Sequence, residues 1–144
     1  MKVTLFIIVL LVTLGFYKNL KTPKKIGVIN GRLASCPWTP NCVNSYSDNP
    51  KYKIEPLTSR SENPLSQVET FLIETYKTKV ISKTDNYLYA VVTTPRFHFK
   101  DDLEFLLGED GKSINVRSSA RVGYSDLGVN RARIERLRDY LNQD

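Results

Sequence analysis

The sequence has few of the residue types on which most metal sites and catalytic centres depend. Its 144 residues include one histidine, two cysteines, one methionine and one tryptophan. A structural zinc site takes four nitrogen or sulfur ligands, and one histidine and two cysteines are too few to provide them. The chain also lacks the glycine-rich loop of nucleotide-binding proteins and the nucleophile elbow of hydrolases. We therefore expect a domain without a metal or a cofactor, and favour a non-enzymatic protein.

Acidic residues are absent from the first 35 positions, which hold six of the 21 basic residues. The other 15 basic residues are balanced by 15 acidic ones, so the whole formal charge of +6 belongs to the N-terminal segment. Because nucleic-acid binding needs a basic surface that neutralises phosphates, the neutral remainder argues against a nucleic-acid partner. Basic residues beside an apolar stretch suit anionic lipid headgroups better.

The longest apolar stretch runs from Val3 to Tyr17, between Lys2 and Lys18. As a helix it would be about 22 Å long at about 1.5 Å per residue, which is short for a membrane span, although flanking lysines can reach both interfaces. A cleaved signal peptide is the alternative, for which the segment around Leu14 is a weak cleavage site. We expect an uncleaved single-pass anchor that attaches the chain to a membrane.

Two features make opposite predictions about the side of the membrane on which the domain lies. Four lysines between residues 18 and 25 follow the apolar stretch, and the positive-inside rule would keep the domain cytoplasmic. Cys36 and Cys42 could close a small loop through a disulfide, which persists only in an oxidising compartment; two reduced thiols are the alternative. We give the cysteines more weight and expect the domain on the exported side, whether periplasmic, extracellular or lumenal.

The length that remains suits one domain. About 110 residues can bury a single hydrophobic core, and no internal repeat divides the sequence. We therefore expect an N-terminal membrane segment (residues 1–18), a basic linker (19–32) and one folded domain (33–144).

Hydrophobic periodicity predicts two helices around a set of strands. Asn63 and Pro64 suit the start of the first helix, and Asn130 suits the N-cap of the second. The expected buried stripes are Leu65, Val68, Phe71 and Leu72 in the first helix, and Ile134, Leu137 and Leu141 in the second. Alternation and turn residues predict strands near residues 79–83, 87–94, 103–107 and 114–122. The predicted fold is α+β, a four-stranded antiparallel sheet flanked by an N-terminal and a C-terminal helix.

Residues 36–60 are rich in proline and do not alternate, so we expect an ordered but irregular segment on the domain surface. Trp38 lies within it, between two prolines. A lone tryptophan in such a place is more typical of a plug over the core than of a ligand platform.

Three separated motifs occur in order along the domain: CPWTPNCVNS at residues 36–45, FHFKDDLEF at 97–105 and RSSARVGYSDLGVNR at 117–131. Together they resemble domain-of-unknown-function family 1499, from about Leu33 to the end of the chain. The resemblance implies a cell-envelope or plastid context. It implies no reaction and supplies no catalytic residues.

The last motif holds the densest group of polar side chains. Alternation places Arg117, Ser119 and Arg121 on one face of the last strand, close to the start of the following helix. Arginine forks and a helix N-terminus suit a carboxylate or phosphate, which predicts an anion pocket here. The predicted ligand-binding residues are Arg117, Ser119, Arg121, Tyr124, Asp126, Asn130 and Arg131.

A purely structural role for the same arginines is equally well supported. A hairpin through residues 108–113 would place Glu104 opposite Arg117 and Asp102 opposite Ser119, with Phe105 opposite Val116. Such cross-strand charge pairs are each worth a few tenths to about 1 kcal/mol on a partly solvated face.

The enzymatic alternative is hydrolytic or acid-base chemistry by His98 with Asp101 or Asp102. In an extended segment His98 would point away from Phe97 and Phe99, which is more typical of an exposed polar residue than of a base. Asp101 and Asp102 would then point to opposite faces, so they would not form a carboxylate pair.

The sequence thus predicts a membrane-tethered, non-enzymatic module of the cell envelope. Its expected partner is an anionic small molecule, a lipid or a protein, bound at the arginine-rich strand end.

Overall fold

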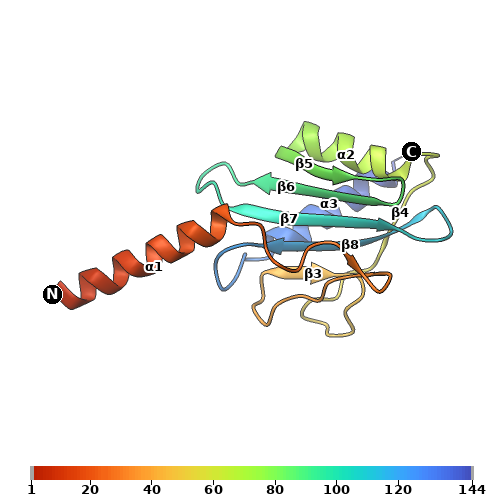
Figure 1. The fold of residues 1–144 in the computed structure, drawn as a ribbon. Coiled ribbons are helices and arrows are strands. Elements are labelled where there is room, and N and C mark those ends of the chain that lie inside the picture. The colour runs from red at the N-terminus through yellow and green to blue at the C-terminus, as the bar shows by residue number, and fades with distance from the viewer. Residues whose placement is uncertain (1, 144) are drawn as a thin grey trace.

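The structure is a computed structural model, and it describes residues 2–143. Its elements, in chain order, are α1 (Lys2–Leu20), β1 (Val28–Ile29), β2 (Arg32–Leu33), β3 (Cys42–Asn44), β4 (Leu57–Thr58), α2 (Pro64–Thr75), β5 (Lys77–Lys83), β6 (Tyr87–Thr93), β7 (Lys100–Leu107), β8 (Ser113–Ala120) and α3 (Val129–Leu141). Beyond α1, the chain forms an α+β domain in which two helices lie on one antiparallel sheet (Figure 1).

The main sheet has six strands rather than the predicted four. Its order is β3-β8-β7-β6-β5, and β4 pairs with the other end of β8. The two additional strands come from residues 36–60, for which we predicted irregular structure. Strands of two or three residues are too short to show alternation, and β8 supplies the pairing that forms them.

The register of the β7–β8 hairpin is confirmed in full. Phe105 pairs with Val116, Glu104 with Arg117, and Asp102 with Ser119. All strand pairs in the sheet are antiparallel, as predicted.

The hydrophobic core lies between one face of the sheet and the two helices α2 and α3 (Figure 1). The predicted helix stripes are buried, and they meet Leu88, Leu103, Phe105, Ile114 and Val116 from the strands. The opposite face of the sheet carries charged and tyrosine side chains instead. The segment after α1 crosses this second face, where β2 buries Leu33 and the backbone N–H of Gly27 reaches Glu104.

The two domain helices begin differently. Asn63 is the N-cap of α2 and Pro64 its first residue, as predicted, although the Asn63 side chain makes no capping bond. The prediction that Asn130 caps α3 is wrong, because the N-cap is Gly128 in a left-handed conformation (φ 81°). Asp126 provides the capping oxygens, accepting from the N–H groups of Gly128 and Asn130. Asn130 instead lies wholly buried in the first turn.

Helix α1 projects from one end of the domain (Figure 1). It extends past the predicted Tyr17 to Leu20, and its side chains are almost all exposed. Val3–Leu20 is long and apolar enough to cross a membrane, with a mean hydropathy of 2.0. A signal sequence has the same properties, so the helix is consistent with a signal or an anchor.

Candidate functional site

Arg117 forms a buried ion pair with Glu104 on the sheet face opposite the helices. Arg117 Nη1 lies 3.0 Å from Glu104 Oε2, and Glu104 is fully buried. The other oxygen accepts from the Tyr87 hydroxyl at 2.8 Å and from the Gly27 N–H at 2.6 Å. Burial, followed by the nearby Glu104 carboxylate, raises the pKa of Tyr87 far above its ordinary value, so the phenol stays a donor.

A second group of the same composition lies nearer to α1. Arg121 binds Asp102 with two nitrogens, Nε to Oδ2 at 2.9 Å and Nη2 to Oδ1 at 2.7 Å. The Tyr89 hydroxyl donates to Asp102 Oδ1 at 2.6 Å. Burial and the hydrogen bond to Asp102 raise the pKa of Tyr89 well above its ordinary value. The Arg121 side chain is only 4% exposed, so its charge is both neutralised and covered.

A third buried pair lies on the helix face of the sheet. Arg133 Nη2 of α3 lies 2.7 Å from Asp101 Oδ2, and Arg133 Nη1 donates to Asn130 Oδ1 at 2.9 Å. The Ser118 hydroxyl donates to the same Asn130 oxygen. Burial raises the pKa of Asp101 against the opposing influence of Arg133. This pair fixes the start of α3 to the sheet.

The two cysteines form the predicted disulfide, Cys36–Cys42. The loop that it closes is fixed to the end of β8, because Asn41 Nδ2 donates to the carbonyl of Gly123 at 2.8 Å and the Asn41 carbonyl accepts from Ala120 N. The prediction that Trp38 plugs the core is wrong. Its side chain is 75% exposed and packs on the Tyr124 ring, with ring centroids 5.5 Å apart.

The last turn of α1 is attached to the domain through Asn19. Asn19 Nδ2 donates to the His98 carbonyl at 2.9 Å, and Asn19 Oδ1 accepts from Lys100 N at 2.8 Å. The Asn19 carbonyl also lies 3.3 Å from Arg121 Nη1. Both edges of the Asn19 amide are therefore used, and they join α1 to the β6–β7 loop and to the start of β7, whereas the backbone carbonyl of Asn19 meets Arg121 after β8.

A cleft of about 500 Å³ lies between α1 and the domain at this point. One wall is Leu11, Leu14 and Lys18 of α1, and the other includes Trp38 and Val122. Most of the exposed lining is apolar, and Lys18 is the exposed cation in the cleft. An amphiphile with an anionic head fits this combination of surfaces.

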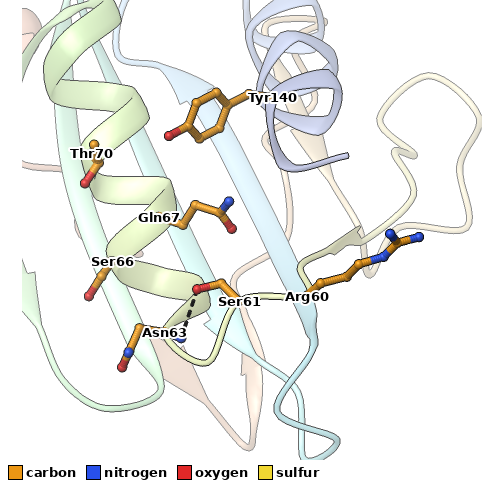
Figure 2. Close-up of a pocket in the computed structure, with 7 residues that line it drawn as sticks. All are labelled: Arg60, Ser61, Asn63, Ser66, Gln67, Thr70 and Tyr140. Atoms are coloured by element: carbon orange, nitrogen blue, oxygen red, sulfur yellow. Dashed lines mark hydrogen bonds between the residues drawn. The ribbon is translucent and has the colours of Figure 1, made fainter. Parts of the chain in front are cut away.

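A larger hollow of about 680 Å³ lies between α2 and α3 (Figure 2). It is lined by Arg60, Ser61, Asn63, Ser66, Gln67, Thr70 and Tyr140. Gln67 of α2 and Tyr140 of α3 point into the space between the helices, whereas Ser66 and Thr70 lie on the other side of α2 in this view and the Arg60 guanidinium points away (Figure 2). The hollow is open and contains neither a titratable pair nor a carboxylate, so it offers less chemistry than the cleft beside α1.

The family described as protein of unknown function (DUF1499) matches residues 32–141, more than half of the chain. The chain belongs to the DUF1499 family. Neither a curated protein nor a solved structure matches it. The DUF1499 match includes the disulfide loop, the six-stranded sheet and both domain helices, and leaves α1 outside.

The residues predicted to bind a ligand in this DUF1499 domain lie in different environments and do not line one pocket. Arg117 and Ser119 are buried on the charged face of the sheet, and Arg121 pairs with Asp102 beside them. Asn130 is buried towards the core, Asp126 caps α3, and Arg131 lies 3.5 Å from the Lys51 carbonyl. Tyr124 is the exposed member, at 61%, and packs on Trp38. An anion at Arg117 or Arg121 would have to displace a buried carboxylate.

The residues of the enzymatic alternative are not assembled as an acid-base group. His98 is exposed, as predicted, but it lies in the β6–β7 loop with φ 54° rather than in an extended segment. Its imidazole makes no hydrogen bond to residues 2–143, whereas Asp101 and Asp102 each bind an arginine. The two carboxylates do point to opposite faces of β7, as predicted, because Asp101 meets α3 and Asp102 meets Tyr89.

Two residues, one that attaches α1 and one on the surface near the site, were not predicted. Asn19 lies at the end of the apolar stretch, and only the folded structure shows what its amide binds. Leu127 is 93% exposed and has φ 55°. No local feature of the sequence indicates the outward direction of its side chain.

Proposed function

We propose that this DUF1499 protein is a membrane-tethered, non-enzymatic binding module of the cell envelope, and that its ligand is an anionic lipid held in the cleft beside α1. The observation that carries the proposal is the composition of that cleft. An apolar helix that can enter a membrane forms one wall, and the end of β8 with Trp38 forms the other.

The cleft suits both parts of a lipid. Leu11 and Leu14 belong to the apolar run of α1 and face Trp38, which gives an acyl chain an apolar path. Lys18 follows them at the domain end of the helix and is exposed. An acyl chain directed along α1 would therefore bring an anionic headgroup to the Lys18 ammonium, at the level expected of the membrane surface.

The buried charge pairs support a binding role over a catalytic one. Asp101, Asp102 and Glu104 each pair with an arginine within the fold. A general acid or base must be able to reach a substrate, and these carboxylates are covered. Among residues 2–143, no group of three histidine, cysteine, aspartate or glutamate side chains comes together to hold a metal.

The disulfide supports export of the domain. Disulfides persist in oxidising compartments, and Cys36–Cys42 lies on the same loop as Trp38. With α1 as an uncleaved anchor, the DUF1499 domain would lie on the exported side of the membrane, against the prediction of the lysines that follow α1.

The test is the thermal stability of the detergent-solubilised full-length protein with added phosphatidylglycerol or phosphatidylcholine. A ligand present at about 100 times its Kd stabilises the folded state by about 2.7 kcal/mol. We expect phosphatidylglycerol to raise Tm and phosphatidylcholine to raise it less. Val122→Phe, which fills the cleft, should abolish both effects, and Lys18→Gln should remove only the preference between the lipids.

Lys112→Gln is the matched control, because Lys112 is an exposed lysine in the β7–β8 hairpin loop and is not part of the cleft. It should respond to lipid as the wild type does. If phosphatidylglycerol raises the Tm of the wild type and of Val122→Phe equally, the ligand does not bind in this cleft.

A further inference from the structure

Large exposed apolar side chains gather at the end of the domain from which α1 projects. Trp38, Phe97, Tyr124 and Leu127 are 75%, 67%, 61% and 93% exposed, and Phe99 stacks on Phe97. We call these five residues the aromatic end. They lie on the disulfide loop, the β6–β7 loop and the β8–α3 loop, and Figure 1 shows the latter two connections at the α1 end of the sheet.

The three loops are fixed relative to α1 by hydrogen bonds. Asn19 binds the His98 carbonyl of the β6–β7 loop and contacts Arg121 at the end of β8. Asn41 of the disulfide loop binds the carbonyl of Gly123 in the β8–α3 loop. The aromatic end therefore has a defined position along the axis of α1.

Trp38 lies beside the apolar part of α1, and the β6–β7 loop is attached at Asn19, just beyond it. The cleft places Trp38 beside Leu11 and Leu14, which precede Tyr17 by about two helical turns and about one turn. A membrane that contains α1 must then reach the loops around it. We propose that the aromatic end is a second membrane contact, whose side chains insert into the interface of the bilayer that holds α1.

The chemistry of these side chains fits a bilayer interface. Tryptophan and tyrosine are enriched where headgroups meet acyl chains, because their rings have an apolar body and a polar edge. Exposed basic residues accompany them, since Lys18 lines the cleft with Trp38 and Arg96 precedes Phe97, and both suit anionic headgroups. The partly exposed Asp126 carboxylate of the same end accepts from the Gly128 and Asn130 N–H groups. The neighbouring Asp102 is buried against Arg121, so it does not repel such headgroups.

Leu127 gives independent support. A leucine at φ 55° is strained, because its side chain crowds the backbone in the left-handed region. Its side chain is 93% exposed, so no packing in the domain offsets this strain. A lipid environment supplies the missing apolar contact.

The inference rests on the anchoring of α1 that we proposed, and it does not require a ligand in the cleft. Leu127 and Phe97 do not line the cleft, so their contact with lipid can be measured separately from lipid binding there.

The experiment uses the single tryptophan of the chain as a depth probe. Full-length protein is reconstituted in vesicles of phosphatidylcholine and phosphatidylglycerol that contain brominated lipids. Quenching of Trp38 by these lipids is compared with quenching by aqueous acrylamide. Two further variants carry Trp38→Phe together with either Phe97→Trp or Ile29→Trp; Ile29 is also an exposed apolar residue, at 57%, in the β1–β2 hairpin.

We expect bromine near the headgroup end of the acyl chain to quench Trp38 and the Phe97→Trp variant strongly, and the Ile29→Trp variant at least fivefold less. Leu127→Asn, which suits the left-handed backbone, should keep Tm and weaken the lipid quenching of Trp38. If acrylamide quenches Trp38 and the Phe97→Trp variant as strongly as it quenches the Ile29→Trp variant, while the protein remains membrane-bound, the inference is overturned and the anchor is left intact. Protection from both quenchers would indicate a protein contact and would also overturn it. Release of the protein by alkaline carbonate would refute the anchor and the inference together.

Discussion

Glu104 and Arg117 face each other across β7 and β8 and form a buried ion pair, with 3.0 Å between Oε2 and Nη1. The carboxylate also accepts from Tyr87 and from the backbone of Gly27. The same pattern recurs with Asp102, Arg121 and Tyr89. The arginines that the sequence suggested as anion ligands thus pair with carboxylates of β7, and the segment that covers the sheet is bound by Glu104 through Gly27 N–H and by Arg121 through the Asn19 carbonyl.

Loss of Arg117 should therefore destabilise the domain. Arg117→Met leaves Glu104 buried without its cation, which costs about 3–5 kcal/mol in comparable buried pairs. The measurement is chemical denaturation of the domain. Arg60→Met is the control, since Arg60 is exposed, and it should change the free energy of unfolding by less than about 0.5 kcal/mol. If Arg117→Met lowers the free energy of unfolding as little as this control does, Arg117 has no structural role.

Tyr87, which is half-buried, and Tyr89, which is buried, should make the domain labile in alkali. The folded state raises the pKa of Tyr87 and Tyr89 above the ordinary value of 10.0, so it holds these protons more tightly than the unfolded chain does. Their contribution to stability is complete below about pH 10 and is lost as the pH rises further. In an absorbance titration, part of the signal from the eight tyrosines should appear only on unfolding. A Tyr87→Phe, Tyr89→Phe variant should lose most of this late signal; an unchanged titration would refute it.

Removal of the disulfide should lower stability modestly. A loop as short as that of Cys36–Cys42 gives about 2 kcal/mol in the chain-entropy description. The Cys36→Ser, Cys42→Ser variant should unfold at correspondingly lower denaturant concentration. Protein isolated without reductant should incorporate no thiol label, and full labelling would argue against an exported domain.

Asn19 should control how firmly α1 is joined to the domain. Asn19→Leu removes the acceptor of the Lys100 N–H, and a hydrogen bond worth about 1 kcal/mol corresponds to roughly fivefold faster amide exchange. Hydrogen exchange read by NMR reports this amide directly. The Gly108 N–H, bonded to Ser113 in the far hairpin, should exchange at an unchanged rate. An unchanged exchange rate of the Lys100 amide would mean that its hydrogen bond to Asn19 does not persist in solution.

The elements with strong periodicity could be predicted from the sequence. Both buried helix stripes, the α+β class and the register that pairs Glu104 with Arg117 follow from alternation and from the hairpin loop. The family was also recognisable from three motifs. The short strands β3 and β4 could not be predicted, because two or three residues carry no period and their pairing depends on β8.

The site was harder to predict than the fold. The density of arginines in residues 117–131 indicated an anion pocket. Composition alone does not show whether an arginine binds a ligand or a carboxylate of the same chain. Trp38 illustrates the same limit. Its neighbours Pro37 and Pro40 indicate a loop, but only the folded structure shows that its ring is exposed and packs on Tyr124. Polar residues with long-range roles, such as Asn19 and Asn130, leave no local signal.

The most direct test of a membrane-tethered lipid-binding module is the native mass of the full-length protein released gently from its membrane without reductant. The account predicts a chain that retains α1, lacks two hydrogens at Cys36 and Cys42, and carries a mass increment of one anionic phospholipid. That increment should be present in Lys112→Gln and absent in Val122→Phe. A chain cleaved after α1, or an increment that is the same in wild type and Val122→Phe, would contradict the account.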